Sequence, residues 1–112
     1  MVRAARFEIT QKRTDSALSL SIAGELDMRT TDVLWQQLEE SLASGISELT
    51  LDLTDLEFMD STGLRLLIRL NDRSQDETWR LRLLFPKAES AALVLRVTGT
   101  DAALPFKHAT ER

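Results

Sequence analysis

A serine hydroxyl stands where this chain is expected to pass from a strand into a helix. Ser61 belongs to the segment Asp60–Leu64, which reads Asp-Ser-Thr-Gly-Leu. Either Ser61 or Thr62 is therefore expected at or beside a helix N-cap, where unpaired backbone N–H groups and the helix dipole favour an anion. A phosphate group would be tolerated there. On spacing alone, however, the better interpretation of Ser61 is a plain capping residue.

The elements on either side of this segment follow from hydrophobic spacing. The residues before it, Leu49–Leu53, alternate apolar and polar side chains with the period of a strand. After it, Leu64, Leu67 and Ile68 recur at the spacing of one helical face, so all three are expected to face a core. Ser61 would then lie at the junction of the two elements.

The rest of the chain continues this alternation of strands and helices. The expected elements lie at residues 7–10, 18–22, 34–42, 49–53, 61 onward, 81–85, about 87–97, and 104–106. Gly45 and Gly99 are placed as helix stops. The order is therefore β-β-α-β-α-β-α-β, an α/β arrangement in which strands separated by helices become parallel neighbours. No linker or internal repeat divides it, so residues 1–112 are expected to form a single domain.

The composition excludes several kinds of active site. The chain has 112 residues, of which 43% are hydrophobic and 29% are charged, as in soluble globular proteins. It contains no cysteine, so disulfides and thiolate metal sites are excluded. Its one histidine, His108, leaves little for a metal site or a Ser-His-Asp triad. We therefore expect no metal, no cofactor and no enzymatic activity.

Charge and hydropathy also restrict the partners and the compartment. The formal net charge of −4 argues against nucleic acid as a main partner. No apolar run has the length of a signal peptide core or a membrane span, so membrane insertion is not expected. These features favour a cytoplasmic protein. The absence of long apolar stretches at surface positions favours a monomer or a weak dimer.

Three motifs resemble the anti-sigma factor antagonist family, which has the STAS fold. They are Gly24–Asp27 (Gly-Glu-Leu-Asp), Leu51–Leu53 followed by Phe58–Leu64, and Val97–Asp101. The resemblance extends from about Phe7 to Phe106. It implies a small mixed sheet of four to five strands with helices packed mainly on one face.

In functional terms the resemblance implies partner switching. The unphosphorylated protein would bind an anti-sigma factor that is also a serine kinase, and so free the sigma factor. The kinase would phosphorylate the matching serine, Ser61, which releases the antagonist, and a serine phosphatase would reset it. In such a cycle the chain is a ligand and a substrate, not a catalyst.

The resemblance also implies which residues contact the partner. The candidates are Asp27, Met59, Asp60, Thr62, Gly63 and Arg65. Asp27 is equally well explained as a helix cap, and Asp60 either orients the Ser61 hydroxyl or caps the turn. Thr62 is the second choice of phosphoacceptor. Gly63 would let a partner backbone approach closely.

Arg65 begins a stripe of arginines, with Arg69 and Arg73, on the helix after the motif. Such a stripe is usually a solvated face, here expected to pair with Asp72, Asp76 and Glu77. Arg65 itself is placed to offset the charge of Asp60 beside a phosphate. Family members usually carry a small residue at that position.

The end of this helix departs from the family pattern. The family usually has glycine near the end of this helix, where Glu77 and Thr78 stand here, so a left-handed helix stop is less favourable.

The same fold also serves as an accessory subunit of lipid or anion transporters, in which the Ser61 region would contact an ATPase subunit without being phosphorylated. A serine hydrolase is disfavoured because Ser61 lacks the Gly-x-Ser-x-Gly setting.

Overall fold

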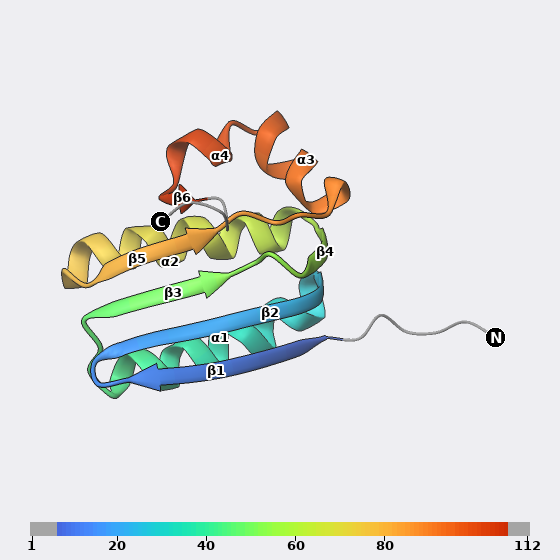
Figure 1. The fold of residues 1–112 in the computed structure, drawn as a ribbon. Helices are drawn as coiled ribbons and strands as arrows, with labels where there is room; N and C mark the ends of the chain where they lie inside the picture. Colours follow the sequence, from blue (N-terminus) through green and yellow to red (C-terminus); the bar gives the residue numbers. More distant parts are fainter. Residues whose placement is uncertain (1–6, 108–112) are drawn as a thin grey trace.

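A six-stranded sheet carries two long helices against one of its faces (Figure 1). The computed structural model describes residues 7–107, so His108 lies outside the described residues. The elements in chain order are β1 (Glu8–Thr14), β2 (Ala17–Leu26), α1 (Met28–Ala43), β3 (Glu48–Asp52), β4 (Leu56–Met59), α2 (Ser61–Glu77), β5 (Arg80–Leu84), α3 (Glu89–Val97), α4 (Thr100–Ala103) and β6 (Phe106–Lys107).

The sheet is mixed, with one antiparallel pair at its edge. Its strand order is β1-β2-β3-β5-β6, and only β1 runs antiparallel to its neighbour, because a tight turn joins it to β2. The ten-residue strand β2 has two parallel partners. Its first half pairs with β3, and its last residues pair with β4, beyond the end of β3. This second pairing determines where α2 begins.

The core lies between the sheet and the helices α1 and α2. Leu20, Leu51 and Leu83 stand in register on three neighbouring parallel strands, and each is fully buried. Leu38 of α1 and Leu67 and Leu70 of α2 are also fully buried. Burying an aliphatic side chain of this size contributes about 1.5–3 kcal/mol, so this layer fixes both helices on one face. Figure 1 shows α1 and α2 running behind the strands, with α3 and α4 beyond the β5 edge.

The expected small mixed sheet with helices on one side is confirmed, and the structure adds two elements. Strand β4 and the single turn α4 had no expected counterpart. The expectation that Ile68 faces the core is wrong, because its side chain is 42% exposed while Leu66 and Leu70 are buried. The inner face of α2 is therefore rotated relative to the Leu64–Ile68 line.

Helix α2 ends in a left-handed residue although no glycine stands at its C-terminus. Its C-cap residue, Thr78, adopts the left-handed conformation with φ of 60° and ψ of 34°. A β-branched residue rarely takes this conformation, because its Cβ is crowded by the backbone. The helix thus has the left-handed stop usual in proteins but makes it with a strained residue.

Candidate partner-binding and phosphorylation site

Two helices begin side by side at the same end of the sheet. Strands β2 and β4 run parallel, and their last residues, Leu26 and Met59, are paired. Each strand is followed by one aspartate, Asp27 or Asp60, which caps the next helix. The backbone N–H of Asp60 donates to the carbonyl oxygen of Leu26 at 3.2 Å. The starts of α1 and α2 therefore form one continuous surface.

Asp60 is the N-cap of α2. Its Oδ1 accepts hydrogen bonds from the backbone N–H of Thr62 at 2.9 Å and of Gly63 at 3.3 Å. The same oxygen accepts the Thr62 hydroxyl at 2.5 Å. These bonds satisfy donors that a helix start otherwise leaves unpaired. Asp60 therefore caps the helix and engages Thr62, and it does not orient the Ser61 hydroxyl.

Ser61 is the first residue of α2, and its side chain is exposed. Its hydroxyl forms no hydrogen bond with any other residue between 7 and 107. The interpretation of Ser61 as a plain capping residue is therefore wrong, because Asp60 performs that role. The hydroxyl is left free at a helix N-terminus, where a negative charge is favoured.

Asp27 forms a capping box at the start of α1. Its Oδ1 accepts the backbone N–H groups of Arg29 at 3.0 Å and Thr30 at 3.1 Å, and its own N–H donates to Thr30 Oγ1 at 2.8 Å. The N–H of Thr30, more than any other group, holds the pKa of the Asp27 carboxyl below its ordinary value. Asp27 is therefore an ionised helix cap beside the Ser61 turn.

Two of the expected contact residues lie beneath the surface. Met59 is fully buried, and Gly63 is buried where α2 packs on β2 and β4. A Cβ at Gly63 would come within 2.8 Å of Met59 Cγ and 3.0 Å of Leu26 Cδ2. The expectation that Met59 and Gly63 contact a partner is corrected, because both sites serve packing here. Gly63 allows the close approach of α2 to the strands.

The arginine stripe on α2 divides into engaged and free members. The guanidinium of Arg69 stacks over the Trp35 ring of α1, 4.1 Å from its centroid. Arg73 bonds Glu39 of α1 at 2.5 Å and Glu77 at 2.9 Å, and its pKa is raised chiefly by the bond to Glu39. Arg65 is exposed and has no partner among residues 7–107.

The remaining expected partners of the stripe differ from the sequence-based expectation. Glu77 does pair with Arg73, but neither Asp72 nor Asp76 forms an ion pair within the described part of the chain. Trp79 donates its Nε1–H to Glu77 at 3.0 Å, and this bond is the main cause of the lowered pKa of Glu77. Arg69 and Arg73, but not Arg65, therefore join α1 to α2.

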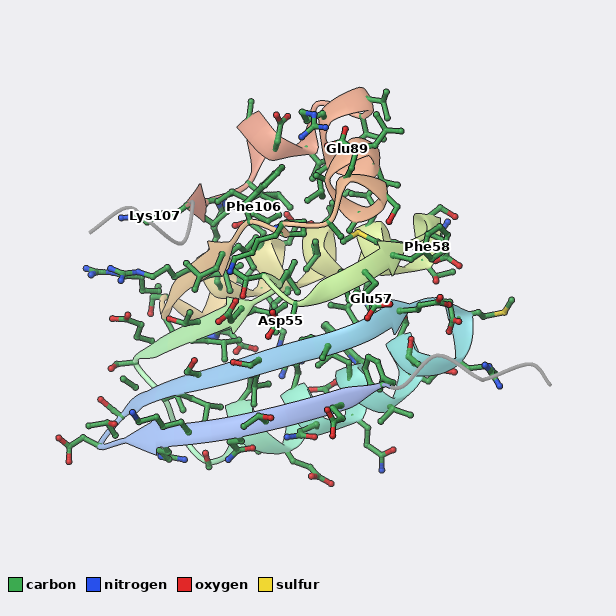
Figure 2. All side chains as sticks on the ribbon, turned by 45° about the vertical axis from the view of Figure 1, so that its right-hand side comes forward. Asp55, Glu57, Phe58, Glu89, Phe106 and Lys107 are labelled. Atoms are coloured by element: carbon green, nitrogen blue, oxygen red, sulfur yellow. The ribbon has the colours of Figure 1, made fainter. Side chains whose placement is uncertain are left out.

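Apolar side chains are exposed beside the Ser61 turn. Met28, the first residue of α1, is 70% exposed. Sequence reasoning missed it, although its position directly after the Asp27 cap was a usable signal. Phe58 of β4 is 40% exposed. Figure 2 labels it on the strand that leads to Ser61. An ionised, partly apolar surface of this kind suits a protein partner.

Over residues 7–107, no group of three or more histidine or acidic side chains is arranged to hold a metal ion. None of the helices in this range has the length and hydropathy needed to span a membrane.

The comparison with known families decides the assignment. Residues 9–105 match the family model described as Mlab, STAS domain. The chain belongs to the STAS family. The motifs at residues 24–27, 58–64 and 97–101 all fall within this match.

Several solved structures share this fold over nearly the whole chain. An anti-sigma factor antagonist from Mycobacterium paratuberculosis is 25% identical, with a TM-score of 0.80 over 94% of this chain and 87% of that one. The anti-sigma factor antagonist SpoIIAA in its unphosphorylated form is 21% identical, with a TM-score of 0.75 over 95% and 90% of the two chains. The Bacillus cell fate determinant SpoIIAA in its phosphorylated form is 20% identical, with a TM-score of 0.70 over 95% and 93%.

Proposed function

We propose that this STAS protein is an anti-sigma factor antagonist that binds an anti-sigma serine kinase and is released when Ser61 is phosphorylated. The observation that carries the proposal is the exposed Ser61 hydroxyl, which forms no hydrogen bond within residues 7–107 while Asp60 caps α2. The likeness to the Mycobacterium paratuberculosis antagonist supports the general role. The two forms of SpoIIAA, which share the fold, are consistent with a phosphorylation switch.

The reaction would be a phosphoryl transfer from ATP to Ser61 in the kinase active site. The Ser61 oxygen forms a bond to the γ-phosphorus, the bond from that phosphorus to the bridging oxygen breaks, and ADP leaves. The hydroxyl proton passes to a base of the kinase. Ser61 has no internal hydrogen bond to lose, whereas the Thr62 hydroxyl must first leave Asp60. Ser61 is therefore the favoured acceptor.

The surface around Ser61 suits a switch because the fold tolerates a phosphate that a partner would not. At the start of α2 a phosphate would stabilise the helix by up to about 2 kcal/mol. Placed in an interface without a counter-charge, the same group would cost about 2–5 kcal/mol of binding free energy. That cost corresponds to about 30-fold to several-thousand-fold weaker binding. Asp27, Asp60, Thr62 and Arg65 are the proposed contacts.

The complete cycle would need a serine phosphatase to regenerate the free hydroxyl. The STAS chain itself is proposed to act as ligand and substrate in the cytoplasm, as a monomer or weak dimer, without cofactor, nucleic acid or membrane insertion. Its family is one of regulatory binding domains, which fits this role.

The test is intact-protein mass spectrometry after incubation with ATP and an extract of the source cells. Wild type and the control Thr62→Ala should gain the mass of one phosphate, and Ser61→Ala should not. A known kinase substrate added to the same extract reports that kinases are active. If that substrate is phosphorylated and wild type is not, the proposal fails. A transporter accessory subunit, which contacts an ATPase without phosphorylation, would then be the better assignment.

A further inference from the structure

The contacts between α1 and α2 follow a regular ladder. Arg69 stacks on Trp35, and Arg73 pairs with Glu39, so in both rungs the α2 residue is numbered 34 higher than its α1 partner. Each rung is one helical turn from the next, because residues four apart lie on the same face of a helix. The two arginines are thus held by groups that α1 supplies.

The next rung toward the helix starts lacks such a group. The same spacing places Arg65 opposite Thr31, which has no carboxylate or aromatic ring to offer. Thr31 Oγ1 is the one buried side-chain polar atom without a hydrogen bond among residues 7–107. Arg65 correspondingly has no ion pair, hydrogen bond or ring contact in that range. Arg65 is therefore an exposed cation, and α1 supplies no anion opposite it.

Ser61 lies one turn before Arg65 on the same face of α2. A neutral hydroxyl gives a guanidinium little to bind, but a phosphate has about two negative charges and three acceptor oxygens. Charge-assisted bonds between a guanidinium and a phosphate are short and strong, and they are often bidentate. Arg65 is therefore within one helical turn of the atom that would acquire this charge.

We infer that Arg65 binds the phosphate group on phosphorylated Ser61, and so leaves the partner-binding surface when that surface becomes negative. The inference rests on the proposed function, since it describes the regulation of the same site. Phosphorylation would then act twice on one surface: it adds about two negative charges and removes a positive charge that was available to the partner. A release mechanism by added charge alone would leave Arg65 exposed.

The other charges of α2 and of its cap do not replace Arg65 in this role. Asp60 repels the phosphate, and its Oδ1 is occupied by Thr62 and Gly63. Arg69 is two turns from Ser61 and stacked on Trp35, while Arg73 is bonded to two glutamates. Arg69 therefore provides a matched control, because its removal changes the net charge equally without touching the phosphate.

The experiment places phosphoserine at position 61 of the full chain during translation, so no kinase is required. The second pKa of the phosphate is then measured by ³¹P NMR titration in wild type, Arg65→Gln and Arg69→Gln. A guanidinium beside the phosphate favours its dianion, so this pKa should be about 0.3 units lower in wild type than in Arg65→Gln. Arg69→Gln should match wild type.

An equal phosphate pKa in all three proteins would overturn the inference, and so would an effect of the same size in Arg69→Gln. Thermal unfolding supplies a second readout: the change in Tm on phosphorylation should be more favourable in wild type and in Arg69→Gln than in Arg65→Gln, by about 2 °C. Because translation installs the phosphate, these results are independent of whether a kinase recognises Ser61. Failure of the proposed function would instead appear only in the extract experiment.

Discussion

Asp60 donates its backbone N–H to the carbonyl oxygen of Leu26 at 3.2 Å, and this bond brings together two segments more than thirty residues apart in sequence. Leu26 ends β2 and precedes the Asp27 cap, and Asp60 follows the end of β4 and caps α2. The free hydroxyl of Ser61 and the ionised cap of Asp27 therefore belong to one surface. A partner that binds over Ser61 would therefore also contact the start of α1.

Replacing the acceptor should separate binding from folding. Ser61→Ala removes a hydroxyl that bonds no other residue between 7 and 107, so its stability should stay within about 0.5 kcal/mol of wild type. It should bind the kinase as wild type does. Ser61→Asp should fold equally well, because a carboxylate is favoured in the first turn of a helix. In the interface, however, it should weaken binding at least about tenfold.

Isothermal titration of both variants with the purified kinase measures this difference, and circular dichroism melts give the folding control. Thr62→Ala is a useful comparison because it removes a hydroxyl that is bonded to Asp60. Equal affinities for Ser61→Ala and Ser61→Asp would exclude a charge-operated switch at this position.

Local signals predicted most of this site, and long-range pairing decided the rest. The Leu49–Leu53 alternation gave β3, and the Asp60–Leu64 segment placed the start of α2 at Ser61. The burial of Met59 and Gly63 was not predictable locally. It depends on the pairing of β4 with the far end of β2, a contact between segments distant in sequence. Strand β4 has only four residues, and its two middle side chains, Glu57 and Phe58, are both exposed. Apolar and polar residues therefore do not alternate along it as they do in a typical strand.

The choice of cap was ambiguous for a related reason. Asp60, Ser61 and Thr62 are all good N-cap residues, so composition alone does not determine which of them caps α2. The length of β4 decides, because Asp60 is the residue that remains extended, with φ of −106° and ψ of −170°. In the same way, Trp35 and Glu39, which engage Arg69 and Arg73, lie on α1, and only the packing of the two helices reveals these two contacts.

The stability contributed by Asp27 should depend on pH. Hydrogen bonds, chiefly from the Thr30 N–H, lower the pKa of its carboxyl below the ordinary 3.8. A group with a depressed folded-state pKa stabilises the fold above its ordinary pKa, and this stability is lost as the pH falls through the folded-state value. At pH 7, Asp27→Ala should lower the free energy of unfolding by about 1 kcal/mol.

Thermal melts between pH 2.5 and pH 7 (about one unit below to three above that ordinary pKa) check this prediction. The advantage of wild type over Asp27→Ala should shrink below about pH 4, where the carboxylate becomes protonated. Asp27→Asn keeps an uncharged capping oxygen, so its advantage over Asp27→Ala should change little with pH. A wild-type advantage that persists at the acid end would show that ionisation of Asp27 is not involved.

Gly63→Ala should destabilise the protein even though alanine is the better helix former. The added Cβ would lie 2.8 Å from Met59 Cγ and 3.0 Å from Leu26 Cδ2, so the buried neighbours must move. Overpacking of this kind costs about 1–3 kcal/mol, against a gain of about 1 kcal/mol in helix propensity. We expect a net loss of about 1 kcal/mol in urea unfolding. In a Met59→Ala background the loss should be smaller, and an unchanged loss would place the clash elsewhere.

Thr78→Gly should stabilise the protein by about 1 kcal/mol, because Thr78 holds a left-handed conformation that costs a β-branched residue about 1–2 kcal/mol. Glycine adopts this conformation freely, although it also gains entropy in the unfolded chain. The bond lost, from Thr78 Oγ1 to the Glu77 carbonyl oxygen, is exposed and therefore worth little. Thermal unfolding should show a Tm higher by about 4–8 °C for a domain of this size.

Thr78→Ala is the matched control for the Tm gain, because it removes the same hydroxyl but keeps a Cβ in the left-handed position. If glycine and alanine gave the same Tm, the strain at Thr78 would not limit stability. Partner binding should be unchanged in both variants, since Thr78 lies at the opposite end of the seventeen-residue helix from Ser61. At 1.5 Å per residue that separation is about 25 Å, so stability at one end can be raised without altering the surface at the other.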